Sequence, residues 1–292
     1  MTPPSSRRFP CVLTFDVEDW FQTENLRALF PHRGWEAIPQ RVVGGTERVL
    51  DFLDRHGIPA TFFVLGWVAE RQPSLVKDIQ QRGHEVACHG LRHVLPTRIG
   101  LTEFCDDAQR AREILEHITG RPVTGYRAPS FAVTDDHLAV LPECGFSYDS
   151  SVNPFALHDR YGRVRTLGNP VSPGLYRVHG VLNEIALPVT HVGPVPVPIG
   201  GGGYFRLYPP SLFRFLVRGF VRRHGFYAMY LHSWEFDPDQ PRVTAPGFGR
   251  SFRHYHALRQ VEPRLHRLVA MLRESGAEFL TASDFVDKAV VA

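Results

Sequence analysis

The sequence predicts an α/β fold built on a parallel sheet and organised as a single domain. Short apolar runs rich in β-branched and aromatic residues alternate with segments of helical period, which is the pattern of β-α units. Polar residues gather where several of these runs end, as they do at the carboxyl ends of parallel strands. The 292 residues equal about two average domains. However, α/β barrels of this size commonly form one domain, and no repeat or Pro/Ser linker divides the chain.

Composition and charge are those of a soluble globular enzyme. Hydrophobic residues make up 43% of the chain and charged residues 22%. The net charge of +3 comes from scattered arginines, so we expect no nucleic-acid partner. The first residues are polar and lack the apolar region of a signal peptide, and no segment approaches the ~20 apolar residues of a membrane span. We therefore expect a cytoplasmic protein, and the sequence leaves its oligomeric state open.

Residues 1–9 are expected to form a flexible N-terminal tail, which regular helices and strands follow. Pro73 suits the first turn of a helix, and Thr102 is a candidate helix N-cap. Strands are expected at residues 10–15, 58–66, 84–88, 123–126 and 146–149. Helices are expected at residues 45–55, 73–82, 103–119 and 135–143, several of them ended by glycine.

The second half of the chain begins with a change in amino-acid composition. Residues 152–210 are rich in Pro and Gly and predict an insertion of loops and hairpins over one end of the sheet, including a glycine run at 200–203 read as a loop. Residues 237–251 are expected to form a mobile polar loop. The regular elements expected here are helices at 211–224, 263–274 and 283–291 and strands at 226–231 and 278–280. In the first of these helices, the core stripe is expected to be Leu212, Phe215, Leu216 and Phe220.

The four cysteines, Cys11, Cys88, Cys105 and Cys144, show no Cys-x-x-Cys spacing and mostly lie in apolar runs. Buried free thiols are therefore expected rather than disulfides or a zinc knuckle.

Three carboxylates follow the first strand within four residues: Asp16, Glu18 and Asp19. Burying unpaired acids is costly, so a partner should neutralise them. Because side chains alternate along a strand, Asp16 and Glu18 share one face. A strand that simply ends in solvent, with an acidic cap on the next helix, is the alternative.

Two histidines, His89 and His93, follow the strand expected at 84–88. Imidazole is the commonest neutral nitrogen ligand of a divalent metal, and an i, i+4 pair on one turn of helix presents two nitrogens on the same side. With 15 histidines in the chain, a chance pair at a helix start is the alternative.

Other strand ends carry Arg127, Asp149 and His232. Two histidines and a carboxylate form the ligand set of catalytic metals that keep a position open for water. A second carboxylate can act as general base, and a distant histidine can protonate the leaving group. An arginine would keep the base ionised, and Asp149 would orient or tune a neighbouring group. This arrangement indicates a hydrolase.

The motifs, taken in order, resemble those of the polysaccharide deacetylase family, also called the NodB-homology or carbohydrate esterase 4 family. They are most similar to its subgroup encoded with exopolysaccharide loci. The matching stretches are TFDVEDWFQ at 14–22, HGLRH at 89–93, YRAPSF at 126–131, YDSS at 148–151 and LHSWE at 231–235. Each is weak alone, but five in order span most of the chain.

The resemblance implies a distorted (β/α) barrel and removal of N-acetyl groups from an amino-sugar oligo- or polysaccharide, with a divalent metal, zinc by preference. It implies Asp16 as general base, Arg127 as its partner, His232 as general acid, and His89 and His93 as metal ligands. Many members have two adjacent aspartates in the first motif, whereas Val17 intervenes here. The third ligand is therefore expected to be Glu18, with Asp19 as second choice.

The substrate wall is less defined. Ser130 stands where the family often has an aromatic residue, and Trp20 and Trp234 are candidates to stack on a sugar ring. Two other functions share the barrel: a metal-independent, allantoinase-like hydrolase of cyclic amides, and a non-catalytic carbohydrate-binding homologue.

Overall fold

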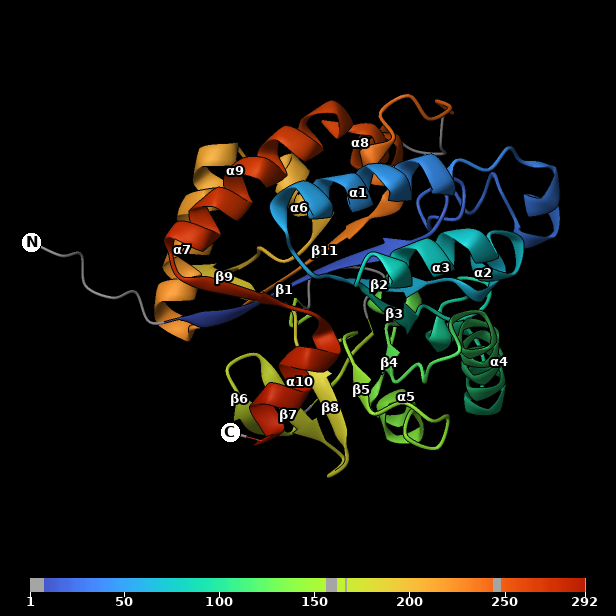
Figure 1. Cartoon of the computed structure of the whole chain (residues 1–292), viewed down its shortest axis with the longest axis horizontal. Coiled ribbons are helices and arrows are strands. Elements are labelled where there is room, and N and C mark those ends of the chain that lie inside the picture. Colours follow the sequence, from blue (N-terminus) through green and yellow to red (C-terminus); the bar gives the residue numbers. More distant parts are fainter. Residues whose placement is uncertain (1–7, 156–161, 166, 244–247, 292) are drawn as a thin grey trace, which may run out of the picture.

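The computed structural model describes residues 8–155, 162–165, 167–243 and 248–291. At its centre lies a mostly parallel sheet (Figure 1). The parallel strands are β1 (Phe9–Val17), β2 (Thr61–Val64), β3 (Glu85–Cys88), β4 (Gly125–Tyr126), β5 (Tyr148–Asp149), β8 (Leu182–Ile185), β11 (Tyr227–His232) and β12 (Ala277–Leu280). Their order is β11-β1-β2-β3-β4-β5-β8, and β12 pairs with the first half of β1. The α/β prediction is confirmed.

The insertion extends this sheet. Strands β6 (Asn169–Ser172) and β7 (Leu175–Val178) add antiparallel to β8, while β9 (Val189–Val192) and β10 (Val195–Pro198) form a separate hairpin. β8 pairs parallel with β5, and all four of its residues are buried. The insertion, expected to form loops and hairpins over one end of the sheet, thus also contributes strands to the sheet itself. Among the described residues no pairing joins β11 to β6, so the barrel stays open there.

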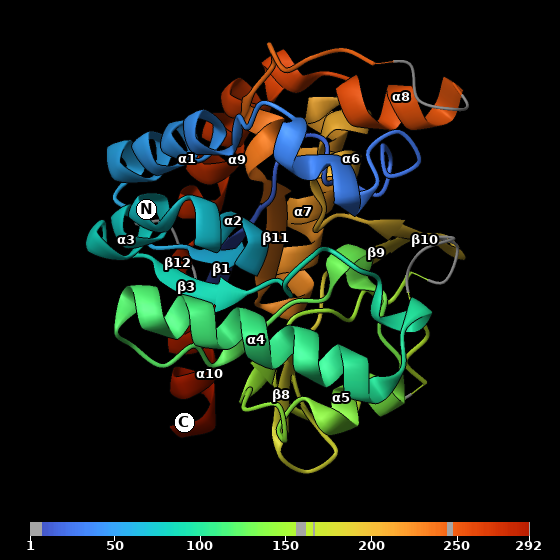
Figure 2. The same cartoon turned by 90° about the vertical axis from the view of Figure 1, so that its right-hand side faces the viewer.

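Helices pack on both sides of the sheet. Those expected are α1 (Val42–His56), α3 (Pro73–Gln81), α4 (Leu101–Thr119), α5 (Asp135–Val140), α7 (Pro210–His224), α9 (Val261–Glu274) and α10 (Ala282–Val291). α1 and α9 lie along one side of β1, and α10 lies on the other (Figure 1 and Figure 2). Within the described chain, no helix combines the length and apolarity needed to cross a bilayer.

Further helices were not expected from the sequence. They are α2 (Gly66–Arg71), α6 (Gly202–Leu207), α8 (Phe248–Tyr255) and the short 3-10 helices η1 (His32–Ala37), η2 (Pro96–Arg98), η3 (Pro129–Phe131), η4 (Ser233–Phe236) and η5 (Leu258–Gln260). The glycine run is therefore partly helical, since α6 begins at Gly202. Likewise α8 overlaps the end of the segment 237–251 expected as a polar loop and continues beyond it. Residues 244–247 of that segment are outside the described chain.

Three details of the sequence prediction are wrong. The core stripe of α7 is Phe213, Val217, Phe220 and Val221, while Leu212 and Phe215 are 45% and 73% exposed. Both stripes have helical period, so spacing could not choose between them. Helix α4 starts after Gly100 with no side-chain cap, and Thr102 lies inside it. The N-terminal tail lies mostly outside the described residues, but Phe9 is buried in β1.

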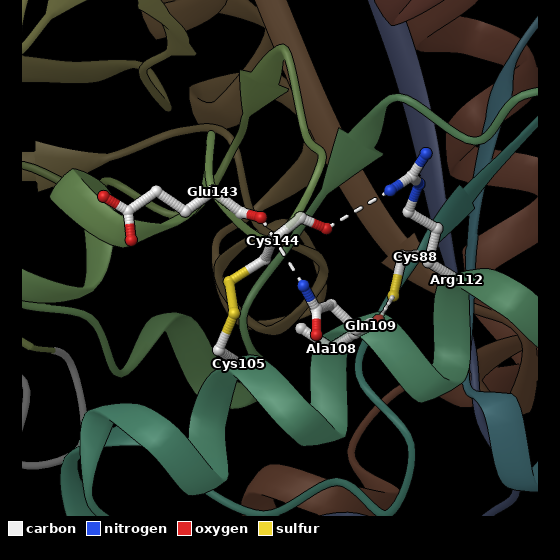
Figure 3. The surroundings of a disulfide bond; sticks show 7 residues. All are labelled: Cys88, Cys105, Ala108, Gln109, Arg112, Glu143 and Cys144. Carbon is white, nitrogen blue, oxygen red and sulfur yellow. Dashed lines mark hydrogen bonds between the residues drawn. A yellow bond between two sulfur atoms is a disulfide. The ribbon is translucent and has the colours of Figure 1, made fainter.

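A disulfide joins Cys105 of α4 to Cys144, which follows α5, with the two Cα atoms 5.6 Å apart (Figure 3). The expectation of four free thiols is wrong for this pair, because the packing of α4 against α5 joins cysteines that are 39 residues apart. Gln109 and Arg112 of α4 donate hydrogen bonds to the carbonyls of Glu143 and Cys144 beside the bridge. Cys11 and Cys88 are free and buried, as expected.

Candidate active site

The sheet places β1 and β11, which are far apart in the sequence, next to each other. β1 and β11 are parallel neighbours, and Asp16 at the end of β1 is the register partner of His232 at the end of β11. The Nε2 atom of His232 lies 3.8 Å from Oδ2 of Asp16 and 3.7 Å from Oε1 of Glu18. Alternation along β1 places both carboxylates on this side, as the sequence predicted.

Asp16 is buried against a buried cation. Nη1 of Arg127 donates to Oδ1 of Asp16 at 2.8 Å and to the hydroxyl of Thr14 at 2.7 Å. The rest of the guanidinium is held by the carbonyl and the hydroxyl of Ser150, at 3.0 and 2.9 Å, and its carbon lies 4.0 Å above the Phe63 ring. The guanidinium is thus fixed with its charge directly against the carboxylate of Asp16.

Glu18, His89 and His93 form a compact donor set. One ligand atom from each lies within 4.8 Å of the other two, and no other such group of three or more occurs among the described residues. Oε2 of Glu18 is 2.8 Å from Nε2 of His93. Nδ1 of His89 lies 2.8 Å from the carbonyl oxygen of Arg127, which can only accept, so Nδ1 carries the proton and Nε2 keeps its lone pair for a metal.

Burial and neighbouring charges shift the pKa values of two of these ligands, Glu18 and His89. Burial would raise the pKa of Glu18, but the neighbouring His93 outweighs it and holds that pKa well below its usual range. Burial lowers the pKa of His89 to about 4, so its ring is neutral near neutral pH. Two imidazoles and one carboxylate are the donors that zinc takes in open catalytic sites, so these residues fit a divalent metal.

The two histidines are held by a loop rather than by the turn of helix that the spacing suggested. Gly90 and His93 have φ angles of 75° and 52°, which helix residues do not adopt. The loop is tied down by Asp107 of α4, which accepts from the backbone N–H of Leu91 at 2.8 Å, and by Arg27, which donates to the carbonyl of His93. A Cβ on Gly90 would lie 3.0 Å from Asp107 Oδ2.

Asp19 lies outside the donor set. Its carboxylate accepts from the backbone N–H groups of Trp20, Arg41 and Val42, at 2.9, 2.7 and 3.1 Å, and so anchors the start of α1. The alternation that places Glu18 beside Asp16 turns Asp19 to the other side. As second choice for the metal ligand, Asp19 therefore has no geometric support.

His232 is paired with Glu235 of η4. Oε2 of Glu235 accepts from the backbone N–H of His232 at 2.8 Å and lies 3.1 Å from its Nδ1. Burial alone would lower the pKa of His232, but Glu235, Glu18 and Asp16 raise it to about 9. The ring is thus protonated near neutral pH and can give up a proton.

Asp149 does not contact His232 or the metal donor set. Its carboxylate accepts from the hydroxyl and the backbone N–H of Ser151, at 2.6 and 3.0 Å. The Ser151 hydroxyl in turn accepts from the backbone N–H of Ala128, so Asp149 supports the strand end that carries Arg127. The carboxylate that contacts His232 is that of Glu235.

A cavity of about 500 Å³ opens onto these residues. Asp16, Glu18, His89, His93 and His232 line its floor. The lining also includes Ser130, several charged side chains, and the aromatic rings of Phe131, Tyr204, Tyr230, Trp234 and Phe252.

Of the two tryptophans expected to meet a sugar, only Trp234 lines the cavity, and its ring stacks on those of His232 and His254. Trp20 packs instead in the core against Phe21 and Phe30. Ser130 does lie in the wall, as expected of its position.

The sequence did not single out Glu235 and Arg206. Glu235 follows His232 by three residues within a motif already quoted, so it carried a signal. Arg206 lies in the insertion and carried none.

Two family models match the chain. The model described as "Polysaccharide deacetylase" matches residues 9–148, and one described as "Domain of unknown function (DUF3473)" matches residues 150–286. The chain is 48% identical over 103 residues to a chitooligosaccharide deacetylase of Sinorhizobium fredii, covering 35% of this chain and 48% of that protein. It is 32% identical over 108 residues to a peptidoglycan deacetylase of Helicobacter pylori, covering 37% of each. The chain thus spans about a third to a half of the curated relatives it matches.

Solved structures share the fold. One, described as a polysaccharide deacetylase from Mycobacterium smegmatis, superposes with a TM-score of 0.64 at 19% identity, covering 100% of this chain and 93% of that one. Another, a carbohydrate esterase 4 pseudoenzyme from Bacillus anthracis, gives a TM-score of 0.51 at 14% identity, covering 96% and 66%. At these identities the likeness concerns the fold. The polysaccharide deacetylase family is therefore assigned to residues 9–148, the part of the chain that its model matches.

Proposed function

We propose that the chain is a metal-dependent hydrolase that removes N-acetyl groups from an amino-sugar oligo- or polysaccharide. One observation carries the proposal: a carboxylate held by arginine, a His-His-Glu donor set and a protonated histidine face a single cavity. The deacetylases among the relatives support the substrate class. The exopolysaccharide setting rests on the resemblance of the motifs alone.

Glu18, His89 and His93 are the residues that would hold the metal. Zinc fits two imidazoles and one carboxylate, and such a metal activates water and polarises the acetamide carbonyl. The chain's own groups do the remaining work. Asp16, which is ion-paired with Arg127, accepts the proton of the attacking water. His232 then donates a proton from Nε2 to the amine as the C–N bond breaks.

The geometry suits these roles. Nδ1 of His232 faces Glu235, which leaves Nε2 directed toward Asp16 and Glu18 at the cavity floor. The proposed base Asp16 and the proposed acid His232, on two adjacent strands, therefore face the same part of the cavity. Aromatic walls match the apolar faces of pyranose rings, on which such side chains stack.

The test pairs metal analysis of the purified protein with acetate release from N-acetylated chitooligosaccharides. We expect about one divalent metal per chain and acetate release that is lost in chelator and restored by zinc. Full activity in chelator would favour the allantoinase-like alternative. Oligosaccharide binding without turnover by the metal-loaded protein would favour a non-catalytic homologue.

A further inference from the structure

We propose that Arg206 and Glu235 form a positioning pair that ties α8, an outer wall of the cavity, to the proton donor His232. This inference rests on the proposed function for the role of His232. It also gives a task to residues 150–286, which match a domain of unknown function. Neither residue is argued to touch the reacting atoms, so both are positioning residues.

The pair is an almost completely buried ion pair at the edge of the cavity. Nε of Arg206, on α6, donates to Oε1 of Glu235 at 2.6 Å, and the two side chains are 3% and 0% exposed. Breaking a buried ion pair by removing one partner is costly, because the other charge stays buried and uncompensated. The pair therefore holds α6 firmly against η4.

Each partner uses its remaining polar atoms on a different part of the site. Oε2 of Glu235 faces Nδ1 and the backbone N–H of His232. Nη1 and Nη2 of Arg206 donate to the carbonyls of Arg253, His254 and His256, at 3.0, 3.2 and 2.6 Å, where α8 ends. A cation at the C-terminus of a helix satisfies free carbonyls and complements the helix dipole.

α8 forms part of the cavity wall. Gly249, Phe252 and Arg253 of this helix line it, as does His256 just beyond. His254 of the same helix is fully buried and stacks on Trp234 at 4.3 Å between ring centroids. Trp234 donates from Nε1 to Oε1 of Glu18 at 3.0 Å. Wall and floor are thus connected through α8.

The glycine run explains how the backbone of α6 comes so close to the carboxylate of Glu235. A Cβ on Gly202 would lie 2.2 Å from Oε2 of Glu235, closer than any side chain tolerates. Only glycine at this first residue of α6 lets the backbone approach the carboxylate that holds His232.

The two matched segments therefore divide the site between them. Residues 9–148 supply Asp16, Glu18, His89, His93 and Arg127. Residues 150–286 supply His232, the pair that positions it, and the wall formed by α6 and α8. The second segment completes the site rather than adding a separate one.

The test compares Glu235→Gln, Arg206→Gln and Arg206→Lys in the full metal-loaded chain. Loss of supporting groups of this kind typically costs about 10–100-fold in activity. In Glu235→Gln we expect kcat to fall by that factor while KM and metal content stay near wild type. In Arg206→Gln we expect kcat to fall and KM for the oligosaccharide to rise. Arg206→Lys, which keeps the charge but not the fork, should recover kcat more than KM.

Glu184→Gln is the matched control, because Glu184 is an equally buried carboxyl of the same segment that bonds the backbone of Val152 and does not reach the cavity. It should leave kcat and KM unchanged. Equal losses in Glu184→Gln and Glu235→Gln would overturn the proposal, because a buried carboxyl that does not reach the cavity would then matter as much as Glu235.

Two further readouts need no turnover. Hydrogen exchange of residues 248–256 should be faster in Arg206→Gln than in wild type. The ¹⁵N signals of the His232 ring should change in Glu235→Gln. Unchanged exchange and unchanged signals would overturn the positioning pair, whatever the activity. A wild-type protein that releases no acetate from any N-acetylated saccharide would refute the proposed function alone, since these two measurements still decide on the pair.

Discussion

Asp16 and His232 are 216 residues apart in the chain but are register partners on adjacent strands, with Oδ2 and Nε2 3.8 Å apart. Parallel pairing of β1 with β11 thus places the proposed base and acid at one edge of the sheet. Each then has its own buried partner: Arg127 for Asp16 and Glu235 for His232.

Replacing the proposed base with its neutral isostere should separate chemistry from binding. In Asp16→Asn we expect acetate release to fall by about 10²–10⁴-fold, because general base catalysis contributes a factor of that size. Metal content should be unchanged, since Asp16 is not in the donor set. Acetate release and metal analysis on the same preparation check this, and activity near wild type would refute the assignment.

A matched pair of isosteric changes tests the third ligand. Glu18→Gln should lower zinc content, as should His89→Ala and His93→Ala, because each removes a donor. Asp19→Asn should keep the metal but reduce the free energy of unfolding by about 1–3 kcal/mol for each backbone N–H left without an acceptor. Metal loss in Asp19→Asn, with metal kept in Glu18→Gln, would reverse the assignment.

The buried carboxyl pair of Asp149 and Glu184 should make stability depend on pH. Burial and the neighbouring Asp149 raise the pKa of Glu184 well above its usual 4.5. The unfolded chain therefore loses this proton first, and the stability present below pH 4.5 declines as the pH rises toward the folded pKa.

Glu184→Gln removes that titration. We expect urea unfolding to give similar free energies for variant and wild type near pH 4.5 and a more stable variant at pH 8. The gap should grow by at most about 1.4 kcal/mol per pH unit. A variant less stable than wild type at pH 8 would contradict this account.

The disulfide should contribute measurably to stability. Cross-linking residues 39 apart removes loop entropy from the unfolded chain worth about 4 kcal/mol in the chain-entropy model. Cys105→Ser with Cys144→Ser should lower the free energy of unfolding toward that amount, and dithiothreitol should do the same to wild type. Mass spectrometry of the non-reduced protein checks the bond itself; two free thiols at these positions would show it to be absent.

Much of the fold could be predicted, because local pattern and tertiary structure agree in the β-α units. The strand before Asp16 is a continuous apolar run, and β1 is buried almost throughout. Where two patterns fit equally, the sequence did not decide. α7 offered two apolar stripes, and the loop of His89 and His93 has the spacing of a helix turn but the φ angles of a loop.

The site was predictable as far as its residues lie in short motifs at strand ends. Glu18 could be preferred to Asp19 because alternation along a strand is a local rule. Arg206 could not be found in this way. Its role depends on the docking of α6 against η4 and α8, which brings together residues 206, 235 and 253–256 through tertiary contacts alone.

The pairing of β1 with three strands has a consequence for biosynthesis. β2 follows soon after β1 in the chain, but β11 and β12 emerge from the ribosome last. A nascent chain that has reached residue 224 already contains Asp16 and all three metal donors, yet it has no proton donor, and one edge of β1 lacks its strand. The proposed active site therefore stays incomplete until β11 and β12 have paired with β1.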